Sequence, residues 1–257
     1  MIAELSPLFL LIAIRIASPA AAAGGDGIPP AASPAGEADI SAPARESRLE
    51  IDLAWKISGS LPEFGHPAID EKIRAWFNRF LAASLAEGGD ILRETTLRID
   101  YRVSRPSDRV LGVAFETSWY ADGAAHPSSS IEILNFSLPG GQVLSPGRLF
   151  REPEKALAVF AELSPGLVLE KFRKEDPDFL AGLADPDDFW LDRDGFAPVW
   201  ENYSRLGLES GGVRIHFGEY QVLAYAYGIQ DVLLPLAALI PAGPNPEVWP
   251  AGASATP

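Results

Sequence analysis

The chain has 257 residues, a net charge of −14 and a hydrophobic content of 47%, which is enough for a buried core in one domain or two small ones. Its acidity argues against a nucleic-acid partner and against docking on anionic lipid, because both need clustered basic residues. Cysteine is absent, which excludes disulfides, thiolate metal sites and a cysteine nucleophile.

The N-terminus has the pattern of a secretion signal. An apolar run at residues 8–14 is followed by small residues from Ala20 to Ala23, so residues 1–23 are predicted to be a signal cleaved after Ala23. Glu4 and Arg15 depart from this pattern, and an uncleaved membrane anchor is the alternative. The run is shorter than the roughly 20 residues that a membrane span needs, so we expect an exported, periplasmic or extracellular protein without a membrane anchor.

Two segments are poor in large apolar residues. Residues 24–48 are rich in Ala, Pro and Gly and are predicted to be a disordered linker, and residues 241–257 a flexible tail. The folded part is therefore expected between residues 49 and 240, divided into a first part, 49–145, and a second part, 146–240.

The first part reads as strands around one helix. Alternation of apolar and polar residues predicts a strand at 49–57, and apolar residues at helical spacing predict a helix over 67–87. Three further strands are predicted at 95–104, 109–119 and 128–138.

The second part opens with a helical pattern over 154–174. Pro165 and Gly166 lie inside this pattern and should kink or split the helix. An acidic loop at 176–195 and strands at 203–208, 213–217, 220–225 and 232–236 follow. The order of elements predicts an α+β fold with antiparallel sheets and two main helical segments, in a two-part domain.

Few residues point to metal or cofactor chemistry. The three histidines, His66, His126 and His216, are far apart in sequence, and no metal-binding or phosphate-loop motif is present. Residues 190–201 match a calcium loop at Asp192, Asp194, Gly195 and Glu201, but Trp190 occupies the first ligand position, which favours a solvated loop. No cofactor and no metal are predicted, and a pair of catalytic carboxylates stays open as an alternative.

Two segments carry candidate binding residues. His126 lies in a turn of small residues with Asp122 and Gly123, where it either locks a hairpin or contacts a ligand. Tyr220, Tyr225 and Tyr227 are the second set. If residues 220–225 form a strand that continues in the same alternation, Tyr225 and Tyr227 share one face and Tyr220 the other. They form either a recognition surface or the edge of the core.

Several of these segments match a known pattern. Residues 49–240 resemble the extracytoplasmic domain family shared by the anti-sigma factor RsiV and the peptidoglycan deacetylase PdaC. The resemblance rests on GAAH at 123–126, NFSL at 135–138, LF at 149–150, FGEY at 217–220, YAYG at 225–228 and VLLP at 232–235.

The resemblance implies a two-part α+β unit that senses lysozyme in the anti-sigma factor and precedes the catalytic domain in the deacetylase. We therefore expect no enzymatic activity, but an exported envelope module that binds a lysozyme-type protein or peptidoglycan glycan. A cell-wall glycan hydrolase or deacetylase-accessory protein and a periplasmic structural or assembly protein are the alternatives. The oligomeric state is left open.

Overall fold

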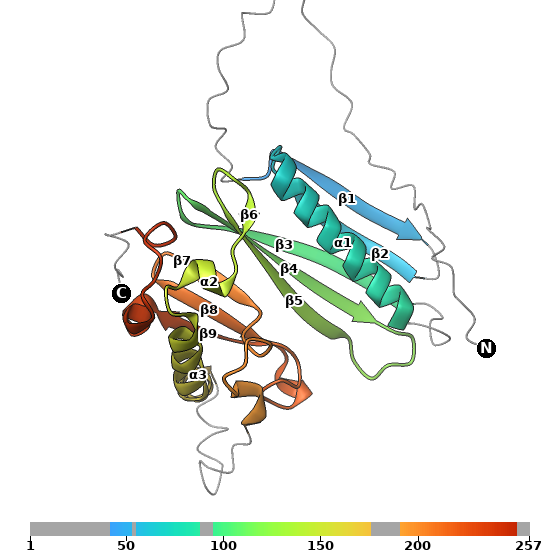
Figure 1. Ribbon diagram of the computed structural model, residues 1–257. Coiled ribbons are helices and arrows are strands. Elements are labelled where there is room, and N and C mark those ends of the chain that lie inside the picture. The colour runs from blue at the N-terminus through green and yellow to red at the C-terminus, as the bar shows by residue number, and fades with distance from the viewer. Residues whose placement is uncertain (1–41, 53–54, 88–94, 176–190, 251–257) are drawn as a thin grey trace, which may run out of the picture.

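The computed structural model describes residues 42–52, 55–87, 95–175 and 191–250 (Figure 1). The predicted signal, most of the predicted linker and most of the acidic loop lie outside the described residues. The α+β fold class is confirmed: two sheets and two long helices make up the body. Within the described residues, no helix is both long and apolar enough to cross a bilayer.

The first sheet has six strands in chain order, β1 to β6. Neighbouring strands are antiparallel, as predicted, except that β2 and β3 run parallel. A parallel pair needs a crossover, and α1 supplies it by lying across one face of the sheet (Figure 1). The elements are β1 (Arg45–Asp52), β2 (Trp55–Glu63), α1 (Pro67–Glu87), β3 (Thr95–Ser107), β4 (Val110–Tyr120), β5 (Ser128–Ser137) and β6 (Gln142–Val143).

The helix α1 begins and ends where the sequence predicts. Its apolar stripe is buried on the sheet, and Trp76 stacks on Phe115 of β4 with ring centroids 4.0 Å apart. At the N-terminal end, Asp70 accepts a hydrogen bond of 2.8 Å from the amide of Phe64. The stripe and this bond hold the crossover in place. The buried stripe comprises Ile69, Ile73, Trp76, Phe77 and Leu81.

The second sheet is a small antiparallel one with α3 packed against it. Its core is rich in aromatic side chains, among them Phe160, Tyr203 and Phe217, all fully buried. The elements are α2 (Pro146–Leu149), α3 (Pro153–Glu175), the 3₁₀ helix η3 (Asp194–Phe196), β7 (Leu206–Glu209), β8 (Gly212–Phe217), the 3₁₀ helix η4 (Tyr225–Tyr227), β9 (Gln230–Pro235) and the 3₁₀ helix η5 (Leu236–Ala242).

The two sheets pack directly on each other through β7, which contacts β3, β4 and β5. Two side chains join the sheets by hydrogen bonds to backbone carbonyls. Asn135 Nδ2 of β5 donates to the Leu206 carbonyl at 2.7 Å, and Arg205 Nε donates to the Ile131 carbonyl at 3.0 Å. Asn135 is buried at 6% exposure, so its bond forms away from water, where an unpaired amide would be costly.

Two predictions at the N-terminal end were wrong. The single strand predicted at 49–57 is a hairpin of β1 and β2, and β1 includes residues 45–48 of the predicted linker. Backbone pairing with β2 extends along the whole of β1, from Arg45 to Asp52. The segment at 45–48 is also fixed by a side-chain bond of 2.5 Å from Ser47 Oγ to Glu63 Oε1.

Of the kink or split predicted for the second helix, the split does not occur: α3 continues through Pro165. The residues on either side of it, Phe160, Ser164 and Val168, are fully buried against the second core. Tertiary packing therefore outweighs the lost backbone hydrogen bond.

The predicted flexible tail is ordered as far as the description runs. Val248 and Trp249 are only 2% and 4% exposed, and Trp249 Nε1 donates to the Glu209 carbonyl at 2.9 Å. The backbone amide of Asn245 also fixes the segment by donating to the Leu149 carbonyl at 2.9 Å. A single buried aromatic residue orders a segment that composition alone marks as loop.

Gly59 tests the tight parallel pairing of β2 and β3. A Cβ at Gly59 would lie 2.0 Å from the Ile99 carbonyl oxygen, and its φ of +145° disfavours any L side chain. We expect Gly59→Ala to lower the free energy of unfolding by about 2 kcal/mol or more. The exposed Gly166, with no atom within 4 Å of its Cβ position, is the control: Gly166→Ala should leave stability unchanged or raise it by about 0.5–1 kcal/mol. Urea unfolding measures both, and a neutral Gly59→Ala would contradict the pairing.

Candidate functional site

The loop between β4 and β5 meets the segment after β8, and three candidate residues come together there. The His126 ring stacks on Tyr225 with centroids 3.8 Å apart and planes 21° apart, and Tyr225 Oη donates to the Pro127 carbonyl. The Tyr220 ring lies 5.3 Å from Tyr225. We call His126, Tyr220 and Tyr225 the aromatic cluster. His126 lies about a hundred residues from the two tyrosines in sequence, but the three side chains form one surface. The residue that His126 contacts is Tyr225.

Backbone contacts hold the two sides of the aromatic cluster in register. Glu219 Oε1 accepts a bond of 2.9 Å from the amide of Ser129, at the start of β5. On the loop, Tyr120 Oη donates to the Ala124 carbonyl at 3.0 Å, and Gly123 has a φ of +83°, which glycine adopts without strain. Asp122 and Gly123 are exposed in this loop, beside His126 in sequence.

Tyr220 presents its ring to solvent from a tight turn. It is 67% exposed and is the one non-glycine residue with positive φ, at 62°, in the described part of the chain. Gln221 closes the turn: its amide donates to the Gly218 carbonyl at 3.1 Å and its side chain accepts from the Gly218 amide at 3.0 Å. A strained residue that displays a large ring is a feature typical of binding sites.

The strand predicted at 220–225 is wrong, and with it the predicted faces of the tyrosines. Val222 and Leu223 are both buried, so the segment does not alternate as a strand does, and it forms a turn followed by η4. Tyr227 leaves the aromatic cluster and packs edge-on against Phe172 of α3, with centroids 5.2 Å apart. It therefore belongs with the core edge.

The segment compared with a calcium loop has a structural explanation. Gly195 lies in η3, where a Cβ would come within 1.8 Å of the Gln221 carbonyl oxygen. The glycine permits this close approach to the turn that carries Tyr220. The Asp192 side chain is satisfied locally, since its Oδ1 accepts from the Asp194 amide at 3.0 Å.

The three histidines lie in three separate places. His66 Nε2 contacts the Pro139 carbonyl at 2.7 Å, His126 belongs to the aromatic cluster and His216 is buried in β8. Across residues 42–52, 55–87, 95–175 and 191–250, no three His, Asp or Glu side chains gather closely enough to hold a metal ion.

His216 is neutral in the folded protein. Burial lowers the pKa of its imidazole to about 4, with Arg214 and Arg102 lowering it further and Asp231 and Glu209 partly offsetting them. Asp231 lies opposite His216 in the ladder of β8 and β9. Burial raises the pKa of Asp231, but hydrogen bonds from Arg214 and Lys171 outweigh this and hold it below its usual range. Asp231, Arg214 and Lys171 thus form a charge network, and the buried imidazole of His216 beside it stays uncharged.

His216 should make stability depend on pH. The unfolded chain takes up a proton near pH 6.5 and the folded chain only near pH 4, so stability is complete above pH 6.5 and is lost as the pH falls towards 4. The loss attributable to this residue is on the order of 3 kcal/mol. Urea unfolding between pH 7 and 4 should show this component in the native protein and not in His216→Asn. Equal pH slopes for the two would contradict the assignment.

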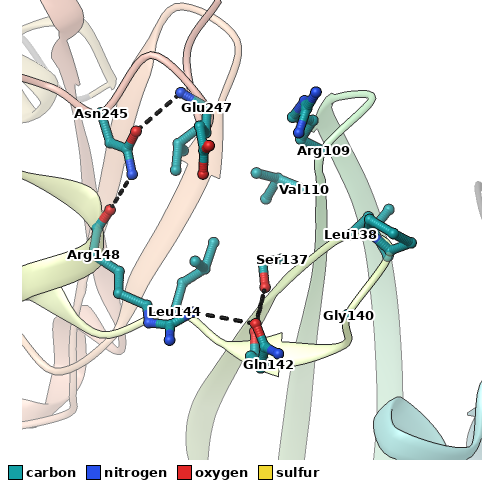
Figure 2. Close-up of a pocket in the computed structure, with 12 residues that line it drawn as sticks. Arg109, Val110, Ser137, Leu138, Gly140, Gln142, Leu144, Arg148, Asn245 and Glu247 are labelled. Atoms are coloured by element: carbon teal, nitrogen blue, oxygen red, sulfur yellow. Dashed lines mark hydrogen bonds between the residues drawn. The ribbon is translucent and has the colours of Figure 1, made fainter.

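A second feature, missed from the sequence, is a cavity of about 350 Å³ between one end of the first sheet, α2 and the C-terminal segment (Figure 2). Four segments wall it: the start of β4, the turn from β5 into β6, α2 and the C-terminal segment. No short motif could have indicated it, because its residues span positions 109 to 248. Its polar lining consists of Arg109, Ser137, Gln142, Arg148, Asn245 and Glu247.

Comparisons with known proteins agree with this architecture. The family model described as "Protein of unknown function (DUF3298)" matches residues 148–237. The chain is 24% identical over 183 residues to the peptidoglycan-N-acetylmuramic acid deacetylase PdaC of Bacillus subtilis, covering 69% of this chain but 37% of that protein. The predicted similarity to the deacetylase is thus confirmed, while the resemblance to the anti-sigma factor stays a prediction.

Two solved structures are similar. A crystal structure of a DUF3298 family protein from Pseudomonas aeruginosa aligns with a TM-score of 0.56 at 16% identity, over 82% of this chain and 99% of that one. A family member from Bacteroides fragilis aligns with a TM-score of 0.49 at 15% identity, over 81% and 97%. The chain thus shares the fold of the first structure and matches the DUF3298 model over residues 148–237.

Proposed function

We propose that this chain is an exported, non-catalytic module of the cell envelope that recognises the glycan of peptidoglycan through the aromatic cluster. Similarity to a protein named as a peptidoglycan deacetylase supports a role at the cell wall. The secretion signal predicted at residues 1–23 supports a periplasmic or extracellular location.

The stacked pair of His126 and Tyr225, with the tilted ring of Tyr220 beside it, carries this proposal. A sugar ring has an apolar face of C–H groups and a rim of hydroxyls, which suits exposed aromatic faces bordered by polar groups. Tyr225 is held from both sides, by His126 and by the Pro127 carbonyl, so little side-chain entropy is lost on binding. The neighbouring ring of Tyr220 extends the platform for a second sugar.

The surroundings of the cluster favour binding over hydrolysis. Cleavage of a glycosidic bond uses two carboxylates placed across the scissile bond. Of the acidic residues beside the cluster in sequence, Glu219 already accepts a bond from the Ser129 amide, which leaves Asp122, exposed on the loop of His126, as a single carboxylate where the reaction needs two. A lysozyme-type protein is the other predicted partner, but a stable protein interface covers about 800 Å² per side, far more than three rings.

Two substitutions test the platform. Tyr220→Ala and Tyr225→Ala should each weaken binding to purified peptidoglycan by about fivefold to thirtyfold, because truncation of a central aromatic residue costs roughly 1–2 kcal/mol. Ile240→Ala is a matched control, since Ile240 is 68% exposed but lies on η5, outside the cluster. Sedimentation with purified sacculi over a range of protein concentrations measures the affinity.

A wild-type chain that stays in the supernatant, or tyrosine variants that bind like the wild type, would overturn the proposal. Immobilised lysozyme serves as the parallel arm. Retention on lysozyme without retention on sacculi would identify a protein partner in place of the glycan.

A further inference from the structure

We propose that the cavity between the first sheet, α2 and the C-terminal segment is a second binding site, which takes a carboxylate attached to a short aliphatic group. It lies at the Ser137 end of β5, whereas the aromatic cluster lies at the Ser128 end. Ten residues of extended chain separate these ends by roughly 30 Å. The two sites are therefore distinct, and a ligand can occupy one without touching the other.

Two arginines without acidic partners give the cavity its charge. Arg148 Nη1 donates only to the neutral Gln142 Oε1, at 3.3 Å, and neither Arg109 nor Arg148 forms an ion pair with any described residue. In a chain of net charge −14, two unpaired guanidinium groups on one cavity favour an anionic ligand.

The neutral and acidic groups define the rest of the ligand. Figure 2 shows Arg148 and Gln142 on one side of the cavity, with Arg109 and Glu247 across from them. Glu247 is exposed and is the only carboxylate in the lining, so it is placed to accept a bond from a ligand N–H. The aliphatic side chains of Val110, Leu138, Leu144 and Val248 complete the wall and suit a methyl group.

The walls are formed before any ligand binds. Asn245 Nδ2 donates to the Arg148 carbonyl at 2.8 Å, and its Oδ1 accepts from the Glu247 amide at 3.0 Å. Beside Arg109, the Leu138 amide donates to the Arg109 carbonyl at 2.8 Å. The backbone at both arginines and at the glutamate is thus fixed, which lowers the entropy cost of binding.

A carboxylate beside a methyl group and an N–H occurs in two parts of peptidoglycan: the end of an alanine-terminated peptide and an N-acetylmuramic acid whose stem peptide has been removed. The choice of these probes rests on the proposed function, but the measurement does not. We would titrate ¹⁵N-labelled protein with acetyl-D-alanyl-D-alanine and, separately, with N-acetylmuramic acid. The amidated dipeptide and N-acetylglucosamine, which lack the carboxylate, are the neutral controls.

We expect saturable shifts at Ser137, Gln142 and Asn245 with at least one acid, and none with its neutral counterpart. The acid that binds identifies the source of the carboxylate. Arg109→Gln with Arg148→Gln should weaken binding at least tenfold, because the charge-assisted bonds are lost. Both arginines are exposed, so the fold should persist, and Arg173→Gln on α3 is the matched control.

Absence of shifts at the cavity with both acids, or equal shifts with the amidated dipeptide, would overturn the proposal. Binding that survives in the double variant would overturn it too. Tyr220→Ala separates the two proposals, because it should weaken sedimentation with sacculi and leave the cavity shifts unchanged. A negative result for one site can then be recognised without a measurement on the other site.

Discussion

The packing of β7 across the first sheet is the constraint on which the rest of the molecule depends. Asn135 and Arg205 fix this contact with bonds to backbone carbonyls, so the two sheets have a defined register as well as a shared apolar surface. The side-chain amide of Asn135 is buried, its nitrogen donates to the Leu206 carbonyl and its oxygen has no partner among the described residues, so sliding of the two sheets would leave the whole amide unpaired. A shift of β7 against the first sheet would displace the residues that depend on both sheets.

Both proposed sites are built across this junction. The aromatic cluster takes His126 from the first sheet and its tyrosines from the segment after β8. The cavity takes Arg109 and Gln142 from the first sheet, and Arg148 and Glu247 from elements attached to the second. The DUF3298 model matches only residues 148–237, so each site includes residues from outside the matched region.

Charge is distributed unevenly between the parts of the molecule. In the second sheet, Arg214 and Lys171 are balanced by Asp231 and Glu209, and this network stabilises the contact of α3 with β9 while His216 stays neutral. At the cavity the cations have no such balance. Balanced groups stabilise a fold, whereas unbalanced groups retain their electrostatic potential for a ligand.

The sequence by itself determined the elements whose pattern is local. The helix α1 agrees with the prediction of about 67–87, because buried side chains repeat at helical spacing and Pro67 and Gly88 mark its ends, and the α+β class followed from the order of strands and helices. The predictions failed where distant contacts outweigh local preference: at Pro165, where the helix does not split, at Trp249 in a loop-like tail, and at 220–225, where a turn with two buried neighbours replaces the predicted strand.

The sites divide in the same way. Composition and turn chemistry singled out His126, Tyr220 and Tyr225, but only tertiary structure decided that their rings meet and that Tyr227 packs elsewhere. The cavity left no local signal, since an arginine at 109 and another at 148 look like ordinary surface residues until four segments converge. Proximity between such residues depends on strand register and sheet packing, which arise from the whole set of long-range contacts.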